Sequence, residues 1–313
     1  MRKFSAFLLG LLCLFCCACA KGETGDEYTV YAPDGAPALA LSKAFAYDAG
    51  SDGVTYRVVD GSAIGAYVTY NDAEENADAC ILPLNLATKA LGDGERFQMM
   101  GVVTHGNLYL MSTQNTPLQS PSDLIGKTVR IAQLAAVPGL VMKMVLDGQD
   151  IPYQSANESG VAADKVNLTA SGQADFWVAD SLQGESENAY VVADLQAWYG
   201  GDKGYPQAVL VVKKSLVNDD RTAALIAAID GAAGYLATAD LSSVCADVQA
   251  RMPSGKQSKI TKKTLNATTV ARSAIRWEKS PDCRAETDAF LEKARAIAPN
   301  LVGVVADGFY WGN

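Results

Sequence analysis

Apolar and polar residues follow two periods along this chain, and segments with the two periods succeed each other in turn. The run "YTVYA" at 28–32 alternates as a strand does, and "PALALSKAF" at 37–45 then places apolar residues at helical spacing behind Pro37. Further strands are predicted at 55–60, 78–83, 97–104, 108–113, 128–131, 166–169, 172–180, 189–195 and 207–216. Further helices are predicted at 84–91, 137–148, 219–239, 241–251, 268–277 and 283–297.

Strands that alternate with helices predict an α/β fold with a largely parallel sheet. In open sheets of this kind, ligands bind beyond the carboxyl ends of the strands. The segments "EENADACILPLNLA" and "ASGQADFWVADSLQ" share one pattern: a polar lead, Ala-Asp, an apolar run and a polar residue where a helix should begin. Turns of this type divide between residues 30–107 and 128–205. The pattern therefore predicts two half-sites that face each other.

Small or polar side chains follow these predicted strands directly, and we take them as candidate ligand-binding residues. They are Asp34, Gly35, Ala36, Asp60, Ser62, Asn85, His105, Val137, Pro138, Asp180 and Ser181. An aspartate at a turn can equally cap its own backbone, and a lone histidine can hold a strand junction together instead of orienting a ligand. The candidate loops contain no Lys or Arg, which sulfonates and phosphates usually attract. This composition favours a nitrogenous heterocycle with donor groups over a sulfonate or nitrate.

The amino-terminal segment has the features of an export signal. Met1-Arg2-Lys3 is basic, residues 4–20 are apolar without a charge, and a polar stretch follows. The small residue Ala18 precedes Cys19, as in bacterial lipoprotein signals. We therefore expect a signal peptide at 1–18, lipidation at Cys19 and a tether at 19–27, with Cys17 as the second choice. An ordinary secretory signal cut near Ala20 is the alternative.

Charge and cysteine content exclude several classes of function. The whole chain carries a net charge of −9; without Arg2 and Lys3, 24 of the 26 basic residues face 35 acids, a net charge of −11. An acidic chain without a basic patch is a poor nucleic-acid binder. One histidine and three remaining cysteines make no metal framework, and we expect no cofactor. Two of these cysteines, Cys245 and Cys283, would be able to pair in an oxidising compartment.

Several motifs, in this order, carry a resemblance to a known family. They are "APDGAPALAL", "ADACILPLNLATKAL", "VVTHGNLYL", "DLIGKTVRI" before "VPGLVMKMVL", and the ending "DGFYW". The chain resembles solute-binding lipoproteins of ABC importers, of the nitrate/sulfonate/taurine and thiamine-precursor type. It departs from that pattern at Asp180-Ser181, where relatives usually carry Glu-Pro.

The resemblance implies a type II periplasmic-binding-protein fold, with a ligand cleft between two lobes that are each a mixed sheet flanked by helices. Lobe 1 would comprise 28–108 plus 214–313, and lobe 2 would comprise 109–213. It implies a monomeric, non-enzymatic binding protein, held on the extracytoplasmic face of the membrane by its lipid, that delivers a small molecule to an ABC permease. The alternative is an enzyme on the same two-lobed fold, of the thiamine-precursor or menaquinone-pathway type.

Overall fold

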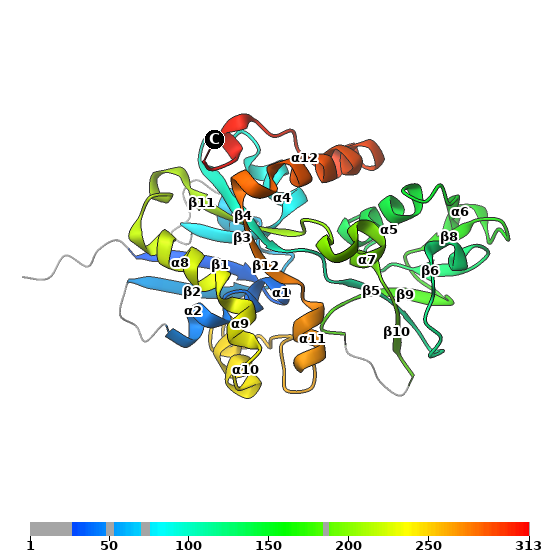
Figure 1. Cartoon of the computed structure of the whole chain (residues 1–313), viewed down its shortest axis with the longest axis horizontal. Coiled ribbons are helices and arrows are strands. Elements are labelled where there is room, and N and C mark those ends of the chain that lie inside the picture. The colour runs from blue at the N-terminus through cyan, green and yellow to red at the C-terminus, as the bar shows by residue number, and fades with distance from the viewer. Residues whose placement is uncertain (1–26, 48–52, 70–75, 184–187, 313) are drawn as a thin grey trace, which may run out of the picture.

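Two six-stranded mixed sheets, one in each lobe, organise the chain (Figure 1). The computed structural model describes residues 27–47, 53–69, 76–183 and 188–312. The expected signal peptide and Cys19 lie outside these residues. The predicted two-lobed α/β fold is confirmed.

The first sheet has the strand order β12-β4-β11-β3-β1-β2. Its strands are β1 (Tyr28–Pro33), β2 (Val54–Val59), β3 (Ala79–Pro83), β4 (Phe97–Thr104), β11 (Ala208–Lys213) and β12 (Ile275–Lys279). β1 pairs in parallel with β2 and β3, whereas β11 runs antiparallel to both β3 and β4. We expected residues up to 213 in lobe 2, but this pairing puts β11 in the first sheet. The apolar run of β11 is buried on both faces there, as a central strand requires.

The second sheet has the order β10-β5-β9-β6-β8-β7. Its strands are β5 (Leu108–Ser112), β6 (Thr128–Arg130), β7 (Tyr153–Ser155), β8 (Val166–Thr169), β9 (Phe176–Asp180) and β10 (Tyr190–Asp194). β6 pairs in parallel with β8 and β9, and β5 runs antiparallel to β9 and β10. The carboxyl ends of β6, β8 and β9 therefore share one edge of this sheet.

Helices flank both sheets. Around the first sheet lie α1 (Ala36–Leu39), α2 (Ser42–Tyr47), α3 (Ala66–Thr69), α4 (Leu84–Leu91), α8 (Asp220–Asp230), α9 (Ala232–Leu236), α10 (Leu241–Ala250), α11 (Ala267–Arg272) and α12 (Ser280–Ile297). With the second sheet lie α5 (Val137–Asp147), α6 (Ala156–Ser159) and α7 (Leu195–Gly200). Short 3-10 turns follow at η1 (Pro121–Leu124), η2 (Gly201–Lys203), η3 (Lys214–Leu216), η4 (Pro299–Leu301) and η5 (Asp307–Phe309).

The predicted helix at 268–277 is wrong in its second half. α11 ends at Arg272, and Ala274 has a left-handed φ of 47°, which a helix does not tolerate. The following residues form β12, which pairs with β4. Two other predicted helices, at 37–45 and 219–239, are each divided into two shorter helices.

The chain crosses between the sheets twice. It leaves the first sheet through residues 105–107, between β4 and β5, and returns through 204–207, between η2 and β11. The two crossings are joined because the Gln207 backbone amide donates to the Thr104 carbonyl at 3.0 Å. We call these two crossings the hinge.

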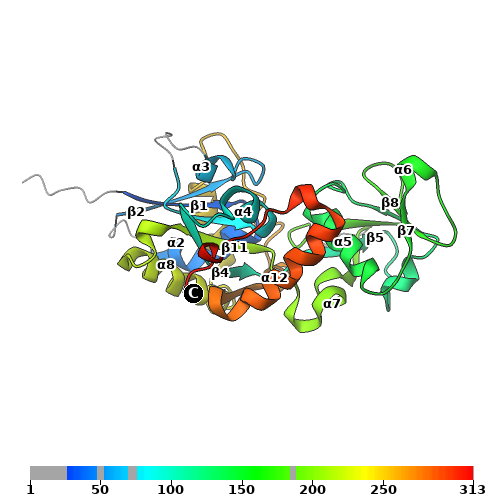
Figure 2. The ribbon, with the colours of Figure 1, turned by 90° about the horizontal axis from the view of Figure 1, so that it is seen from above.

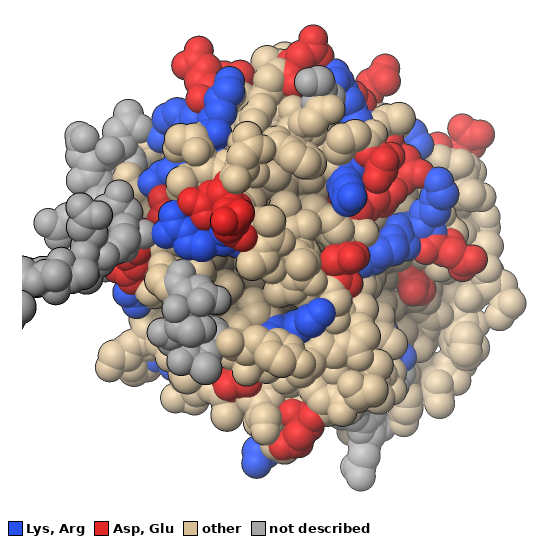
Figure 3. Space-filling model, turned by 60° about the vertical axis from the view of Figure 1, so that its left-hand side comes forward, with Lys and Arg blue, Asp and Glu red and all other residues tan. Residues whose placement is uncertain are grey.

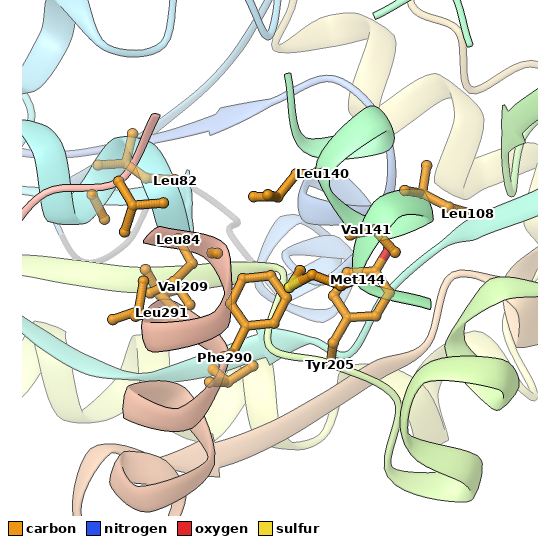
Figure 4. Close-up of a cluster of buried hydrophobic side chains, with 14 of the residues drawn as sticks. Leu82, Leu84, Leu108, Leu140, Val141, Met144, Tyr205, Val209, Phe290 and Leu291 are labelled. Carbon is orange, nitrogen blue, oxygen red and sulfur yellow. The ribbon is translucent and has the colours of Figure 1, made fainter. Parts of the chain in front are cut away.

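An apolar core continues from one lobe into the other. Figure 4 shows Phe290 of α12 beside Met144 of α5 and Tyr205 of the hinge. α12 packs against α5, and Figure 2 shows it lying along both lobes. A second core, with Val30, Leu39 and Leu210, covers the other face of the first sheet. The lobes are therefore joined by packing as well as by the hinge.

Candidate functional site

The turn after β1 is held to a distant loop by Asp34. The Asp34 carboxylate accepts a hydrogen bond from Ser258 Oγ and another from the Lys259 backbone amide, each at 2.7 Å. Gly35 follows with a φ of 128°, a left-handed value that favours glycine, and Ala36 begins α1, which is only four residues long. Asp34 thus has a structural role at this position, but it bonds a distant loop and does not cap its own turn. The basic stretch 256–263 provides its partner.

Asp60 and Ser62 form a self-contained turn after β2. Asp60 Oδ1 accepts hydrogen bonds from the Ser62 backbone amide at 2.8 Å and from Ser62 Oγ at 2.6 Å. These two bonds lower the pKa of Asp60. Both side chains are exposed. The turn is next to that of Asp34, whose backbone amide donates to the Val59 carbonyl at 2.8 Å.

Asn85 lies in the first turn of α4, a helix without a side-chain N-cap. Its Nδ2 donates to the Leu301 carbonyl at 3.4 Å, whereas its Oδ1 is buried and has no hydrogen-bond partner among the described residues. The preceding residue connects α4 with the hinge, since the Leu84 amide donates to the Gln207 carbonyl at 2.8 Å.

In the second lobe, Val137 and Pro138 open α5 behind Ala136, again without a side-chain cap. Gly139 is required at this turn because a Cβ there would lie 1.9 Å from the Leu134 carbonyl oxygen. Leu140 then turns into the shared core and is 2% exposed. The predicted helix start is correct, and its first turn borders the other lobe.

Asp180 and Ser181, at the end of β9, contact different partners. Asp180 Oδ1 accepts a hydrogen bond from the Leu182 backbone amide at 2.9 Å, which is again capping of a local turn. Ser181 Oγ lies 3.1 Å from Ser273 Oγ at the end of α11, and both side chains are buried. Ser181 therefore connects the second lobe with the first.

His105 is buried at the hinge. Its Nδ1 is 2.9 Å from a guanidinium nitrogen of Arg276, so Nδ1 is the acceptor, and its Nε2 is 3.6 Å from a carboxylate oxygen of Glu278. Burial and the positive charge of Arg276 lower the pKa of His105 to about 4. The His105 backbone amide also donates to the Ala274 carbonyl. The neutral ring thus fastens β12 to the hinge, and this contact favours the structural role over ligand binding.

Sequence reasoning missed a polar group at the hinge. Gln207 Nε2 donates to Asn107 Oδ1 at 2.6 Å, while Gln207 Oε1 and Tyr205 Oη are buried with no hydrogen-bond partner in the described structure. The Tyr205 ring stacks on Phe290, with the ring centroids 5.8 Å apart and an angle of 10° between the ring planes. In the sequence, Gln207 is marked only by its position directly before a strand, and many residues that have no role in a site share such a position.

The described residues show neither a metal-binding cluster nor an exposed thiol. They contain no group of three or more His, Cys, Asp or Glu side chains that could hold a metal ion. Cys80, Cys245 and Cys283 are buried free thiols, so the possible pair of Cys245 and Cys283 is not formed. Burial raises the pKa of each thiol. No helix within the described ranges is long and apolar enough to cross a membrane.

A surface hollow of about 490 Å³ lies at the end of the first sheet opposite to the carboxyl ends of β1 and β3, beside the start of β4 and the end of β11. Its lining includes Tyr67, Asn76, Arg96 and Lys213. It is remote from the carboxyl ends of β1 and β3, where α/β sheets bind ligands, so we do not take it as the site. On the face seen in Figure 3, acidic and basic side chains are interspersed.

Comparison with known proteins was made by family, by sequence and by structure. No family model and no curated protein matches the sequence. Solved structures do match. An ABC transporter protein from Parabacteroides distasonis has a TM-score of 0.67 at 16% identity, covering 90% of this chain and 98% of that one. The periplasmic aliphatic sulphonate binding protein SsuA from Escherichia coli has a TM-score of 0.57 at 14% identity, covering 91% of each.

Two further matches differ in kind. The ligand-binding component of an ABC-type import system from Staphylococcus aureus, with zinc bound, has a TM-score of 0.54 at 9% identity, covering 91% of this chain and 96% of that one. The desulfurization enzyme DszB, in complex with biphenyl-2-sulfinic acid, has a TM-score of 0.51 at 16% identity, with the same two coverages. At these identities the likeness establishes the fold. The chain is structurally similar to solute-binding proteins of ABC importers and has the type II periplasmic-binding-protein fold.

Proposed function

We propose that this chain is an extracytoplasmic solute-binding protein that delivers a small organic molecule to an ABC importer. The observation that carries the proposal is the arrangement of two mixed sheets joined by a double-crossing hinge. Closure of two lobes about such a hinge is a common means of enclosing a ligand. The structural likeness to import-system binding proteins supports the same function.

We further propose that the protein is anchored by a lipid on Cys19 and that residues 19–27 form its tether. The support is the charge-free apolar segment, the small residue before Cys19 and the polar stretch beyond it. The permease is the partner that this function requires. We propose a monomer, since one copy supplies both lobes.

The fold also occurs in an enzyme, so catalysis is the competing function. The groups near the hinge do not favour it. His105 is neutral, buried and held by Arg276, which leaves its Nδ1 unable to accept a substrate proton. The described thiols are buried and protonated, and thus poor nucleophiles. Asp34, Asp60 and Asp180 already accept backbone hydrogen bonds.

Mass spectrometry of compounds that co-purify with the mature protein tests the proposed function. We expect a stoichiometric small molecule that dissociates unchanged on denaturation and rebinds on refolding. Isothermal titration with the identified compound should give one site per chain. Conversion of that compound by the purified protein would instead show an enzyme.

A further inference from the structure

Three side-chain polar atoms at the hinge are buried without a hydrogen-bond partner among the described residues: His105 Nε2, Tyr205 Oη and Gln207 Oε1. His105 Nε2 faces the Glu278 carboxylate at 3.6 Å, whereas Tyr205 Oη and Gln207 Oε1 belong to side chains that other contacts hold firmly. Gln207 uses every other polar group that it has: its backbone amide bonds Thr104, its backbone carbonyl accepts from Leu84, and its Nε2 bonds Asn107. Only Oε1 is left without a partner in the described structure. The surrounding bonds fix the direction in which this acceptor points.

Tyr205 is fixed as well. Its ring, 1% exposed, stacks on Phe290 and meets Tyr199 edge-to-face at 5.6 Å. Burial raises the pKa of Tyr205, so its hydroxyl is neutral. The backbone of Asn107 lies close enough to oppose that rise but not in hydrogen-bonding geometry. Figure 4 shows the hydroxyl end of the ring beside Val141 of α5 and away from Phe290 of α12.

The two unpartnered atoms therefore belong to one place. Both side chains adjoin Asn107: the Tyr205 hydroxyl lies near its backbone, and Gln207 Nε2 bonds its side chain. The Gln207 carbonyl also bonds Leu84 at the first turn of α4 in lobe 1, and Figure 4 shows α5 of lobe 2 beside the Tyr205 hydroxyl. This is where the lobes meet at the hinge. Opening of the lobes would expose both atoms to water, and closure would bury them again.

A buried polar group without a partner opposes folding or closure, and most proteins satisfy such groups. Closure over a solute that supplies hydrogen bonds to these atoms removes the free-energy cost of burying them. Closure without such a solute leaves that cost in place. A site of this kind also discriminates strongly against compounds that lack the bonding group. The geometry thus couples ligand identity to closure.

We propose, as a refinement that rests on the proposed function, that Tyr205 Oη and Gln207 Oε1 form a recognition subsite at the hinge. Gln207 Oε1 is an acceptor, so it takes an N–H or O–H donor of the solute. The Tyr205 hydroxyl can donate to a neighbouring acceptor on the same solute. The chemical class is a neutral nitrogenous compound with an N–H group beside a ring nitrogen or carbonyl.

Tyr205→Phe tests the subsite, and Tyr28→Phe is its matched control. Both rings are 1% exposed, but Tyr28 Oη shares a 2.7 Å hydrogen bond with Thr222 Oγ1. If the Tyr205 hydroxyl serves the solute, Tyr205→Phe leaves the Tm of the ligand-free protein unchanged or raises it. Tyr28→Phe lowers that Tm because it breaks a bond within the protein.

Binding is measured by calorimetry. The N–H probes are aminopyrimidine, cytosine and nicotinamide, and pyrimidine is the matched compound without the donor. Methanesulfonate and nitrate are the anion probes. We expect an N–H probe to bind the wild type, pyrimidine to bind more weakly, and Tyr205→Phe to weaken the N–H probe about tenfold. Tyr28→Phe should leave that affinity unchanged. Gln207→Leu should also bind the same N–H probe more weakly; only its affinity, and not its Tm, is compared with that of the wild type.

The subsite is overturned if no N–H probe binds the wild type, if Tyr205→Phe binds it unchanged, or if Tyr205→Phe lowers the Tm as Tyr28→Phe does. Binding of methanesulfonate or nitrate alone would overturn the subsite but leave the solute-binding function intact. Turnover of a bound compound would overturn the proposed function whatever Tyr205→Phe does.

Discussion

Ser181 Oγ lies 3.1 Å from Ser273 Oγ, and this pair joins the end of β9 in the second lobe to the end of α11 in the first. Ser273 Oγ also donates its proton to the Thr269 carbonyl at 2.8 Å. Because a hydroxyl has one proton, Ser181 must be the donor in the pair. Close by, Tyr109 Oη donates to the Arg272 carbonyl. The lobes are therefore held together by side-chain bonds as well as by the hinge.

We expect Ser181→Ala to lower the free energy of unfolding by about 1 kcal/mol, since it removes the donor of a buried hydrogen bond. Ser273→Ala should cost more, because it also removes the bond to the Thr269 carbonyl. The double variant should cost less than the sum, because the two changes share the Ser181–Ser273 bond. Urea unfolding of the four proteins provides the measurement. Ser243→Ala, which removes an exposed hydroxyl bonded to Asp240, is the control. Strict additivity would show that the two serines do not interact.

The buried His105 should make stability depend on pH. Its pKa in the folded protein, about 4, is below the ordinary value of 6.5, so between these values the unfolded chain binds a proton that the folded chain does not. Stability therefore falls as pH falls through this window. The groups around the ring are Arg276, Glu278 and Glu286. We expect a loss of about 1 kcal/mol between pH 7 and 5.5, where carboxylates titrate little.

Equilibrium urea unfolding at pH 7, 6 and 5.5 measures this loss. His105→Gln, which lacks the titrating group, should be less stable at pH 7 but show a nearly flat profile. As His105 is the chain's one histidine, no second imidazole obscures the comparison. An equal slope in the two proteins would mean that another group is responsible.

The sequence-based prediction succeeded where local pattern decides the structure. The alternation at 28–32 and the Pro138-to-Gly148 helix signal both correspond to elements of the fold. It was wrong at 275–279, where β12 exists because it pairs with β4, about 170 residues away along the chain. Pairing at such a separation leaves no periodic trace in a five-residue segment. For this reason the helix predicted at 268–277 was extended over residues that belong to β12.

The candidate site divides in the same way. The turns at Asp34, Asp60 and Asp180 could be located from sequence because strand ends carry local signals. The partners of Asp34, however, are 224 and 225 residues away, so its structural role could not be predicted. Tyr205 and Gln207 were not selected because only the packing of the folded chain reveals which of their atoms lack a hydrogen bond.

The lipid anchor leads to a prediction from sequence alone. Cys19→Ser should move the mature protein from the detergent phase to the aqueous phase in a detergent partition, because the diacylated thiol would be lost. Metabolic labelling with a palmitate analogue should disappear from the same variant. Cys17→Ser is the control, and it should leave both readouts unchanged. Detergent partitioning that persists in Cys19→Ser and is lost in Cys17→Ser would move the anchor to Cys17.

Alanine variants of Asp34 and Asp60 test whether each carboxylate stabilises the fold or binds the ligand. Asp34→Ala removes two bonds of 2.7 Å to the loop at Ser258 and Lys259, so we expect a loss of about 1–3 kcal/mol in urea unfolding. The freed loop should also be cut faster by trypsin after Lys256 and Lys259. Asp60→Ala, an exposed substitution, should change stability by no more than about 0.5 kcal/mol and leave cleavage unchanged. An Asp34→Ala protein of wild-type stability and cleavage that no longer binds the solute would show that Asp34 contacts the ligand instead.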